Sequence, residues 1–291
     1  MTQAEERPLT RIYLFPGQGS QKKGMGAEVF PLFPAETAAA DAILGYPVAG
    51  QCVEDPGGKL SQTQYTQPLL FTVCSLMYLK KRQDTGAPPD MVAGHSVGEF
   101  AALFAAGVFD FETGLKIVQK RGELMSRAVG GGMAAVVGMS ADEVLGVLDA
   151  AGYTTIDVAN LNSPKQSVIS GLKDEVLAVR PAFEAAGARM FVPLDVSGAF
   201  HSRYMQPAQA EFETFVRGFT FAPPQIPVIA NVTARPYEAD AIVENMTRQI
   251  TSPVRWAESM QYLLQQPEPE FEEVGPGVVL TSLMRQIKSA R

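Results

Sequence analysis

Apolar residues in this chain fall into short continuous runs that alternate with longer segments of helical spacing. Short runs bounded by Gly, Pro or polar residues predict β-strands, and apolar residues recurring every three or four positions predict helices. The predicted strands are residues 11–15, 91–93, 227–231 and 270–274. The predicted helices are residues 37–44, 67–81, 99–106, 111–128, 206–217 and 280–287. This alternation favours a mainly parallel sheet with helices on both faces.

Residues 131–196 follow a second pattern. Strands predicted at 133–137, 156–160, 167–170 and 189–194 alternate with helices predicted at 140–151 and 174–186. Ser140 and Glu143 form a capping-box sequence at the start of the first of these helices. The order βαββαβ is typical of a ferredoxin-like unit. We therefore expect an α/β fold in which a large α/β-hydrolase-like domain, residues 1–130 and 197–291, carries an inserted ferredoxin-like small subdomain, residues 131–196.

The first candidate for a catalytic motif is the pentapeptide Gly94-His95-Ser96-Val97-Gly98, which lies between a predicted strand and a predicted helix. Its two glycines allow the tight turn of a nucleophile elbow, which holds the Ser96 hydroxyl at the carboxyl end of the strand. The N–H of Val97 then points toward the same position and can stabilise an oxyanion. The alternative is a glycine-rich connection in which Ser96 only caps the helix. The surrounding strand and helix favour the nucleophile.

A serine nucleophile needs a base, and the chain contains two histidines, His95 and His201. His95 directly precedes Ser96, and because neighbouring side chains diverge at a tight elbow it is badly placed to take the serine proton. His201 is therefore the candidate base, although a lone His is often structural. No Asp is marked as a third member, so a dyad oriented by a backbone carbonyl and a triad both remain open.

A glycine-rich loop, residues 16–21, follows the first predicted strand. Its spacing fits neither the dinucleotide fingerprint nor the Walker loop. The loop presents Gln18 beyond a strand end, so it is either a plain turn or the source of a second oxyanion donor beside Val97. Arg121 lies next to the apolar face of the helix predicted at 111–128, where an Arg is usually solvated.

Composition and charge narrow the class of protein. With 46% hydrophobic and 19% charged residues among 291, the chain has the composition of a globular protein. A net charge of -7 makes it a poor ligand for nucleic acid. It has no membrane-length apolar run and no apolar signal region, so a cytoplasmic location is expected. Cys52 and Cys74 lack metal-like spacing, so two buried thiols and no metal site are expected.

Six motifs occur in a fixed order along residues 11–288. They are Phe15-Pro16-Gly17-Gln18-Gly19-Ser20-Gln21, Gly94-His95-Ser96-Val97-Gly98-Glu99, Arg121, Gly198-Ala199-Phe200-His201-Ser202, Gln249 and Glu273-Val274-Gly275-Pro276-Gly277. Together they resemble the motifs of malonyl-CoA:acyl-carrier-protein transacylases, which also contain an inserted ferredoxin-like subdomain. Residues 111–115 and 120–125 are most similar to the stand-alone acyltransferases that serve polyketide synthase modules.

The resemblance implies roles for the residues around the nucleophile. Ser96 would carry the acyl group as an ester, and His201 would act as general base and acid. Gln18 would lie at the oxyanion site alongside the Val97 amide, and Gln249 would hold His201 through its backbone carbonyl. Val97 stands where a Leu is commoner, which matters little because only its N–H is used.

The resemblance also implies that two residues recognise the acyl group. Arg121 would bind the free malonyl carboxylate, with which a planar guanidinium forms two parallel hydrogen bonds that a Lys does not reproduce. Phe200 would leave room for malonyl and crowd an α-methyl group. The implied reaction is a ping-pong transfer of malonyl from malonyl-CoA to the phosphopantetheine thiol of an acyl carrier protein, without a cofactor.

Three other functions fit the same motifs less well. The fatty-acid malonyl transacylase differs only in its partner. A hydrolase that edits carrier-bound acyl groups has no need of a fixed cation such as Arg121. A docking subunit that kept only the fold would not need Ser96 and His201.

The expected partners are malonyl-CoA and the acyl carrier protein domains of a polyketide synthase, with no nucleic acid and no membrane. We expect the protein to be a monomer. Carrier proteins are usually acidic, whereas this chain is itself negative, so docking should use a local basic patch. Conceivable members are Lys22, Lys165, Lys173 and Arg189.

Overall fold

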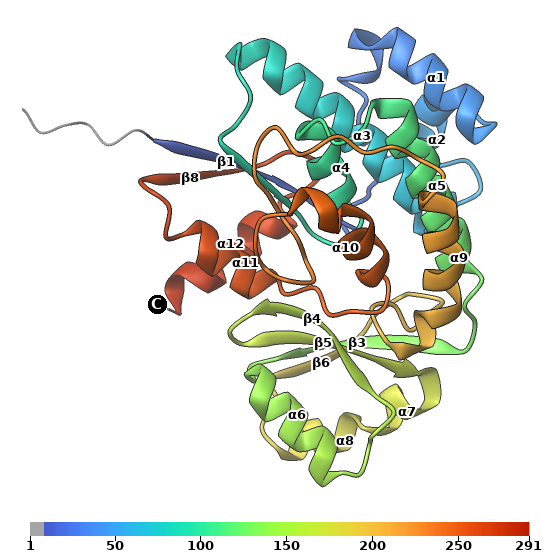
Figure 1. The fold of residues 1–291 in the computed structure, drawn as a ribbon. Helices are drawn as coiled ribbons and strands as arrows, with labels where there is room; N and C mark the ends of the chain where they lie inside the picture. The colour runs from blue at the N-terminus through green and yellow to red at the C-terminus, as the bar shows by residue number, and fades with distance from the viewer. Residues whose placement is uncertain (1–8, 291) are drawn as a thin grey trace, which may run out of the picture.

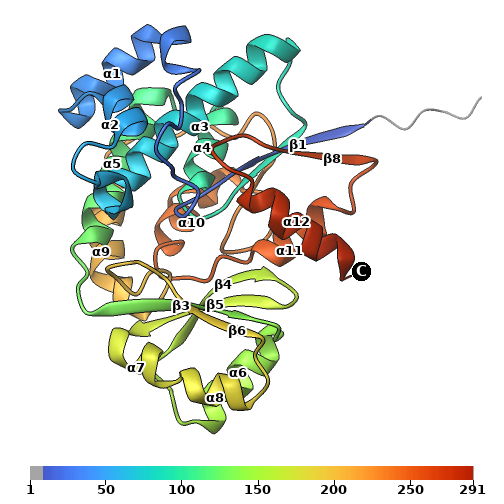
Figure 2. The same ribbon diagram turned by 180° about the vertical axis from the view of Figure 1, so that it is seen from behind.

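The computed structural model describes residues 9–290, and in them the chain forms two sheets of four strands each (Figure 1). The first sheet and most of the helices form the larger part of the molecule. The second sheet and its three helices form the smaller part, drawn below the first. The view from behind shows the same two parts (Figure 2). Within residues 9–290, no helix is long and apolar enough to cross a lipid bilayer.

The large sheet is parallel throughout. Its order is β7-β2-β1-β8. The strands are β1 (Thr10–Phe15), β2 (Met91–Gly94), β7 (Val228–Ile229) and β8 (Pro269–Glu273). Because side chains alternate along a strand, Tyr13 and Phe15 of β1 pack into the core on one face, and Ile12 and Leu14 pack into the core on the other. Both faces are therefore buried, as predicted for a parallel sheet.

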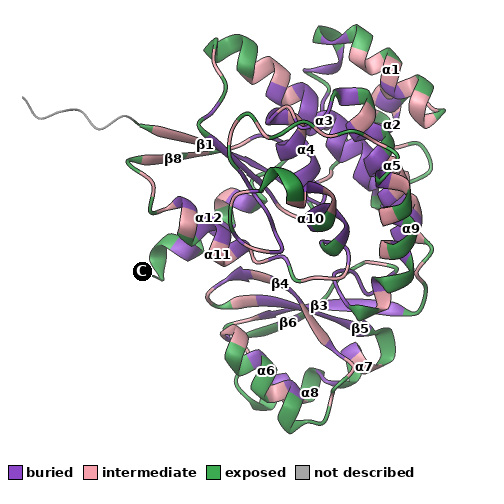
Figure 3. Ribbon diagram, in the orientation of Figure 1, coloured by how far each residue is buried: buried purple, intermediate pink, exposed green. Residues whose placement is uncertain are grey.

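Helices cover both faces of the large sheet. One face carries α3 (Thr63–Thr85) and α4 (Gly98–Ala105), and the other carries α11 (Trp256–Leu263) and α12 (Val279–Ser289). Figure 3 shows α4 as buried along nearly its whole length, which fixes the turn that precedes it. The remaining helices of this part are α1 (Pro34–Leu44), α2 (Val48–Glu54), α5 (Phe111–Ser126), α9 (Gln206–Val216) and α10 (Ile242–Arg248), with 3-10 turns at Phe30–Leu32, Lys59–Ser61, Arg203–Met205 and Ala239–Ala241.

The small sheet is antiparallel and has the strand order β4-β5-β3-β6. Its strands are β3 (Gly131–Val137), β4 (Asp157–Ser163), β5 (Gln166–Leu172) and β6 (Met190–Pro193). The helices α6 (Ala141–Ala150), α7 (Lys173–Ala178) and α8 (Arg180–Ala185) lie on the face away from the large part (Figure 1). The predicted capping box of Ser140 and Glu143 is present at the start of α6. This is the order and pairing of a ferredoxin-like sheet.

Two predictions of local structure are wrong. The helix predicted over 174–186 is broken at Val179 into α7 and α8, because Pro181 has no N–H to continue the first helix and its ring collides with the preceding turn. The strand predicted over 227–231 is only the two residues of β7. The strand predicted over 133–137 is two residues longer in the structure, because Gly131 and Gly132 also belong to β3.

The helices α2, α10 and α11 were not predicted. They contain seven, seven and eight residues, which gives each only about two turns. An apolar stripe so short is difficult to distinguish from the apolar residues of a loop.

Candidate active site

The nucleophile elbow forms between β2 and α4. Ser96 adopts a left-handed backbone conformation with φ of 52°, which is uncommon for a residue other than glycine. Only glycine fits at the two flanking positions, because there is no room for a side chain. A Cβ on Gly94 would lie 2.1 Å from the backbone of Gly98, and a Cβ on Gly98 would lie 2.2 Å from the carbonyl oxygen of Phe15. The turn therefore raises Ser96 at the carboxyl end of β2, as the motif predicts.

Two amide side chains hold the Ser96 backbone. Asn231 accepts a hydrogen bond from the Ser96 N–H through Oδ1 at 2.8 Å, and its Nδ2 donates to the Gly94 carbonyl at 2.7 Å. Gln249 donates through Nε2 to the Ser96 carbonyl at 3.0 Å. Both peptide groups of the strained residue are thus fixed from outside the elbow.

The two imidazoles both line the cavity beside Ser96 but have different hydrogen-bond partners. His201 Nε2 is 2.7 Å from Ser96 Oγ, and His201 Nδ1 is 2.8 Å from the backbone oxygen of Gln249. His95 Nε2 instead bonds Asn162 Oδ1 at 2.8 Å, and its ring packs against Trp256. The geometry therefore brings His201, and not His95, to the Ser96 hydroxyl.

His201 is arranged to accept a proton. A backbone carbonyl can only accept, so Nδ1 must carry the hydrogen and Nε2 is left with its lone pair toward Ser96 Oγ. Burial, with the Arg121 charge as a smaller cause, lowers the pKa of His201 to about 3. The imidazole is therefore neutral at physiological pH. Of the two arrangements that the sequence left open, the structure contains the dyad oriented by a carbonyl.

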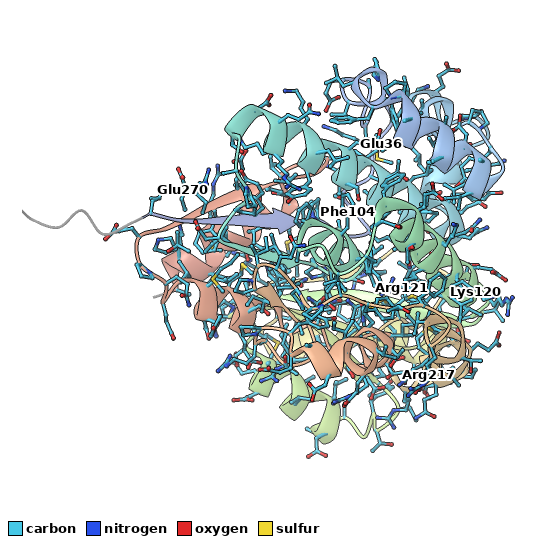
Figure 4. All side chains as sticks on the ribbon, turned by 45° about the horizontal axis from the view of Figure 1, so that its top comes forward. Glu36, Phe104, Lys120, Arg121, Arg217 and Glu270 are labelled. Atoms are coloured by element: carbon cyan, nitrogen blue, oxygen red, sulfur yellow. The ribbon has the colours of Figure 1, made fainter. Side chains whose placement is uncertain are left out.

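Arg121 of α5 is fully buried, unlike most Arg side chains on helices. Figure 4 places Arg121 inside the molecule, whereas Lys120 lies at its surface. Arg121 Nη1 donates to Gln67 Oε1 at 2.6 Å, and Nη2 donates to Gln249 Oε1 at 2.8 Å and lies 3.3 Å from Ser96 Oγ.

The electrostatics around Arg121 are unusual. Its hydrogen-bond partners within residues 9–290 are all neutral, and its Nε has no partner there. Burial lowers the pKa of Arg121 to about 10, which still leaves the guanidinium charged at neutral pH. A buried cation without a contacting carboxylate is costly, and an incoming carboxylate would relieve that cost.

The backbone N–H of Val97 is free to bind an oxyanion. Among the hydrogen bonds of residues 9–290, the N–H groups of Ser96, Gly98 and Glu99 have acceptors, whereas that of Val97 has none. Gln18 lines the same cavity as Ser96 and Val97, and its Nε2 lies 3.4 Å from Thr63 Oγ1. This weak contact leaves the Gln18 amide able to turn toward a ligand.

A cavity of about 90 Å³ opens beside Ser96 and His201. The residues that line it include polar side chains such as Gln18. Its apolar lining includes Met125, Met133, Leu194, Val196 and Phe200. Met133 belongs to β3 and Leu194 follows β6, so the small sheet supplies much of the apolar lining, while the large part supplies the reactive groups. The cavity therefore lies where the two parts meet.

Several residues of the site were missed by sequence reasoning. Asn231 follows β7, the neighbour of the elbow strand, so its place at the carboxyl edge of a parallel sheet was the available signal. Gln67 lies inside a helix without any local mark. Cys52 and Cys74 are both buried free thiols, as predicted. Within residues 9–290, no group of His, Cys, Asp or Glu side chains is placed to hold a metal ion.

Comparisons with known proteins agree with this geometry. Residues 12–289 match the family described as the acyl transferase domain. The chain is 55% identical over 278 residues, 95% of this chain and 96% of the relative, to the polyketide biosynthesis malonyl CoA-acyl carrier protein transacylase BaeC of Bacillus velezensis. It is 38% identical over 283 residues, 94% of this chain and 92% of the relative, to the malonyl CoA-acyl carrier protein transacylase of Escherichia coli.

A solved structure gives the same result in three dimensions. The crystal structure of a malonyl CoA-acyl carrier protein transacylase from Burkholderia pseudomallei superimposes with a TM-score of 0.94 at 47% sequence identity, covering 98% of this chain and 99% of that one. The two-part architecture described above is therefore that of a solved transacylase.

Proposed function

Because this chain belongs to the acyl transferase domain family, we propose that it transfers a malonyl group from malonyl-CoA to the phosphopantetheine thiol of an acyl carrier protein. The observation that carries the substrate assignment is the buried Arg121 guanidinium, 3.3 Å from Ser96 Oγ and bonded only to neutral groups within residues 9–290. A malonyl ester on Ser96 ends in a carboxylate two carbons beyond the ester carbonyl. The malonyl carboxylate would therefore lie close to Oγ, which is where the Arg121 guanidinium is placed.

In the first half-reaction, Ser96 Oγ attacks the thioester carbon of malonyl-CoA while its proton passes to His201 Nε2. The oxyanion is stabilised by the Val97 N–H and the Gln18 amide. When the tetrahedral intermediate collapses, the carbon–sulfur bond breaks and the CoA sulfur takes the proton from His201. The malonyl group remains as an ester on Ser96.

In the second half-reaction, the thiol of the carrier protein gives its proton to the neutral His201 and attacks the ester carbonyl. Collapse returns the proton to Ser96 Oγ and leaves malonyl as a thioester on the carrier. Throughout, the Gln249 carbonyl holds the imidazole by its Nδ1–H, and Arg121 holds the malonyl carboxylate. Each half-reaction conserves protons, and neither requires a metal or redox group.

The identities of the relatives support a role in polyketide synthesis, because identity to the polyketide relative is 55% whereas identity to the Escherichia coli protein is 38%. The carrier would dock through exposed cations. Lys22, Lys173 and Arg189 are exposed, and Lys165, also exposed, pairs with Glu143 at 3.2 Å. We therefore favour the first three as contacts for an acidic carrier.

Intact-mass analysis tests this function. The protein is incubated in turn with malonyl-CoA, methylmalonyl-CoA and acetyl-CoA, and then with a phosphopantetheinylated carrier protein. We expect malonyl to appear on the wild type, to be absent from Ser96→Ala, and to move to the carrier. Rapid release of free malonate in the presence of carrier would instead indicate the editing hydrolase. Failure to load malonyl would indicate a docking subunit.

A further inference from the structure

Glu99 is a buried carboxylate that the proposed mechanism does not use. It is fully buried in the first turn of α4, three residues beyond the nucleophile. Its side chain is not part of the cavity wall. Instead, Tyr237 Oη donates to Glu99 Oε1 at 2.5 Å, and the backbone N–H of Asn231 donates to Glu99 Oε2 at 2.6 Å. Each carboxylate oxygen thus receives a hydrogen bond from the segment that follows β7.

A single residue, Asn231, connects this carboxylate to the nucleophile through hydrogen bonds. The residue whose backbone it binds, Asn231, uses its side chain to hold the Ser96 N–H at 2.8 Å and the Gly94 carbonyl at 2.7 Å. The chain of contacts therefore runs from Glu99 to Asn231 and from Asn231 to Ser96. It begins and ends on the same β-turn-α unit, with Asn231 fixed between the two ends.

Ser96 depends on such support because its backbone is in the left-handed region at φ of 52°. A residue other than glycine keeps this conformation only where its surroundings impose it. The conformation sets the direction of Oγ, which must stay within hydrogen-bond reach of His201 Nε2 for the proton to be transferred. A shift of the Asn231 side chain would release the Ser96 N–H and move Oγ away from the base.

We propose that Glu99 is a positioning residue for acyl transfer, which acts by fixing Asn231 and thereby holding Ser96 in its reactive conformation. The proposal rests on the proposed function only in using the same nucleophile. A carboxylate suits this place because both its oxygens accept, so it satisfies two donors at once. An amide could keep the Asn231 contact only by turning its NH₂ group toward Tyr237 Oη, which would then have to accept, so the buried hydroxyl hydrogen would lose its acceptor.

The surroundings of the carboxylate support this reading. Burial raises the pKa of Glu99 to about 7, and the donors Tyr237 and Asn231, the side chain of Gln249 and the charge of Arg121 all oppose that rise. An acidic group kept in so unfavourable a place without touching the cavity is better explained by what it holds than by packing.

The test uses the full chain and four variants: Glu99→Gln, Tyr237→Phe, Asn231→Ala and the Glu99→Gln/Asn231→Ala double variant. The first readout is the rate at which phenylmethanesulfonyl fluoride sulfonylates Ser96, which requires the nucleophile and its base but no malonyl group. The second is kcat and KM for malonyl transfer. Glu112→Gln, on the exposed side of α5, is the matched control and should change neither.

We expect Glu99→Gln to slow sulfonylation and kcat about tenfold with KM nearly constant, Tyr237→Phe to slow both about threefold, and Asn231→Ala to slow both more than either. Because Glu99 acts through Asn231, the double variant should be no slower than Asn231→Ala alone. Rates within twofold of the wild type for Glu99→Gln, or effects that multiply in the double variant, would overturn the proposal.

Tyr237→Phe retains the ring and removes only the hydroxyl, so it keeps the test decisive if Glu99→Gln does not fold. An unchanged sulfonylation rate in a folded Tyr237→Phe variant would then count against the proposal. Failure of the proposed function is a separate result, in which the wild type is sulfonylated at Ser96 but is not loaded by malonyl-CoA.

Discussion

Replacement of Arg121 by Ala gives the most direct test of how the site selects its acyl group. In the wild type the guanidinium lies 3.3 Å from Ser96 Oγ and has no charged hydrogen-bond partner within residues 9–290. A malonyl carboxylate would become its counter-ion. The variant would leave that carboxylate buried and unpaired, whereas an acetyl group brings no charge to the site.

The size of the effect follows from these contacts. Removing one partner of a buried, hydrogen-bonded ion pair costs about 3–5 kcal/mol. Since about 1.4 kcal/mol corresponds to a factor of ten, kcat/KM for malonyl-CoA should fall roughly 10²- to 4 × 10³-fold. Arg121→Lys keeps the charge but loses the two-pronged contact, so its loss should be intermediate.

The assay measures single-turnover loading of Ser96 by intact mass, with malonyl-CoA and acetyl-CoA in parallel. Acetyl loading serves as the internal control, because it reports any damage to Ser96 from the loss of the neighbouring Nη2 group. We expect the variant to lose malonyl loading and to keep or gain acetyl loading. An equal fall for both substrates would show that Arg121 acts on the nucleophile and not on the carboxylate, and would refute the reasoning.

Three further predictions concern the base, the acyl pocket and the turn. Burial and the neighbouring guanidinium lower the pKa of His201 to about 3. The Glu99→Gln variant removes the other buried group of this region whose pKa lies near neutral, so its rate of Ser96 sulfonylation should be independent of pH from 5 to 8. A rate that falls toward acid pH with a midpoint near 6.5 would contradict the assignment of a neutral His201. Phe200→Ala should raise methylmalonyl loading relative to malonyl about three- to tenfold in an intact-mass competition, since it makes room for one methyl group worth about 0.8 kcal/mol or somewhat more; an unchanged ratio would remove Phe200 from this role. Gly98→Ala should lower the thermal midpoint and abolish loading, because its Cβ would lie 2.2 Å from a backbone oxygen, and wild-type activity would show that the turn relaxes easily.

Much of the fold could be predicted because its signals are local. A short apolar run, a capping pair such as Ser140 and Glu143, or a glycine at a tight turn acts within a few residues, and these features gave the parallel strands and the order of the small sheet. The predictions that failed concern elements that are very short or whose ends depend on a single residue within a longer pattern. The helices α2, α10 and α11 are too short to show periodicity, and Pro181 breaks a helix whose apolar spacing continues across it.

The residues of the candidate site likewise fall into those that a local motif marks and those whose position depends on distant parts of the chain. Ser96 is marked by its own motif, and His201 follows once His95 is excluded by the geometry of the elbow. Arg121 carries no local sign that it is buried, because its burial depends on α3 and on Gln249, which is 128 residues away. The residues around His201 do not identify the partner of its Nδ1, because that partner is a backbone oxygen, which any residue type could provide; only the family resemblance pointed to Gln249.

The placement of the cavity between two sheets has a consequence for how such enzymes diversify. The groups proposed to make and break bonds, Ser96 and His201, belong to the large part, whereas much of the apolar lining, including Met133 and Leu194, comes from β3 and from the segment after β6. Substitutions there can enlarge or reshape the space for the cargo without disturbing the proton shuttle. Attempts to broaden the range of acyl groups should therefore begin with libraries confined to β3 and the segment after β6.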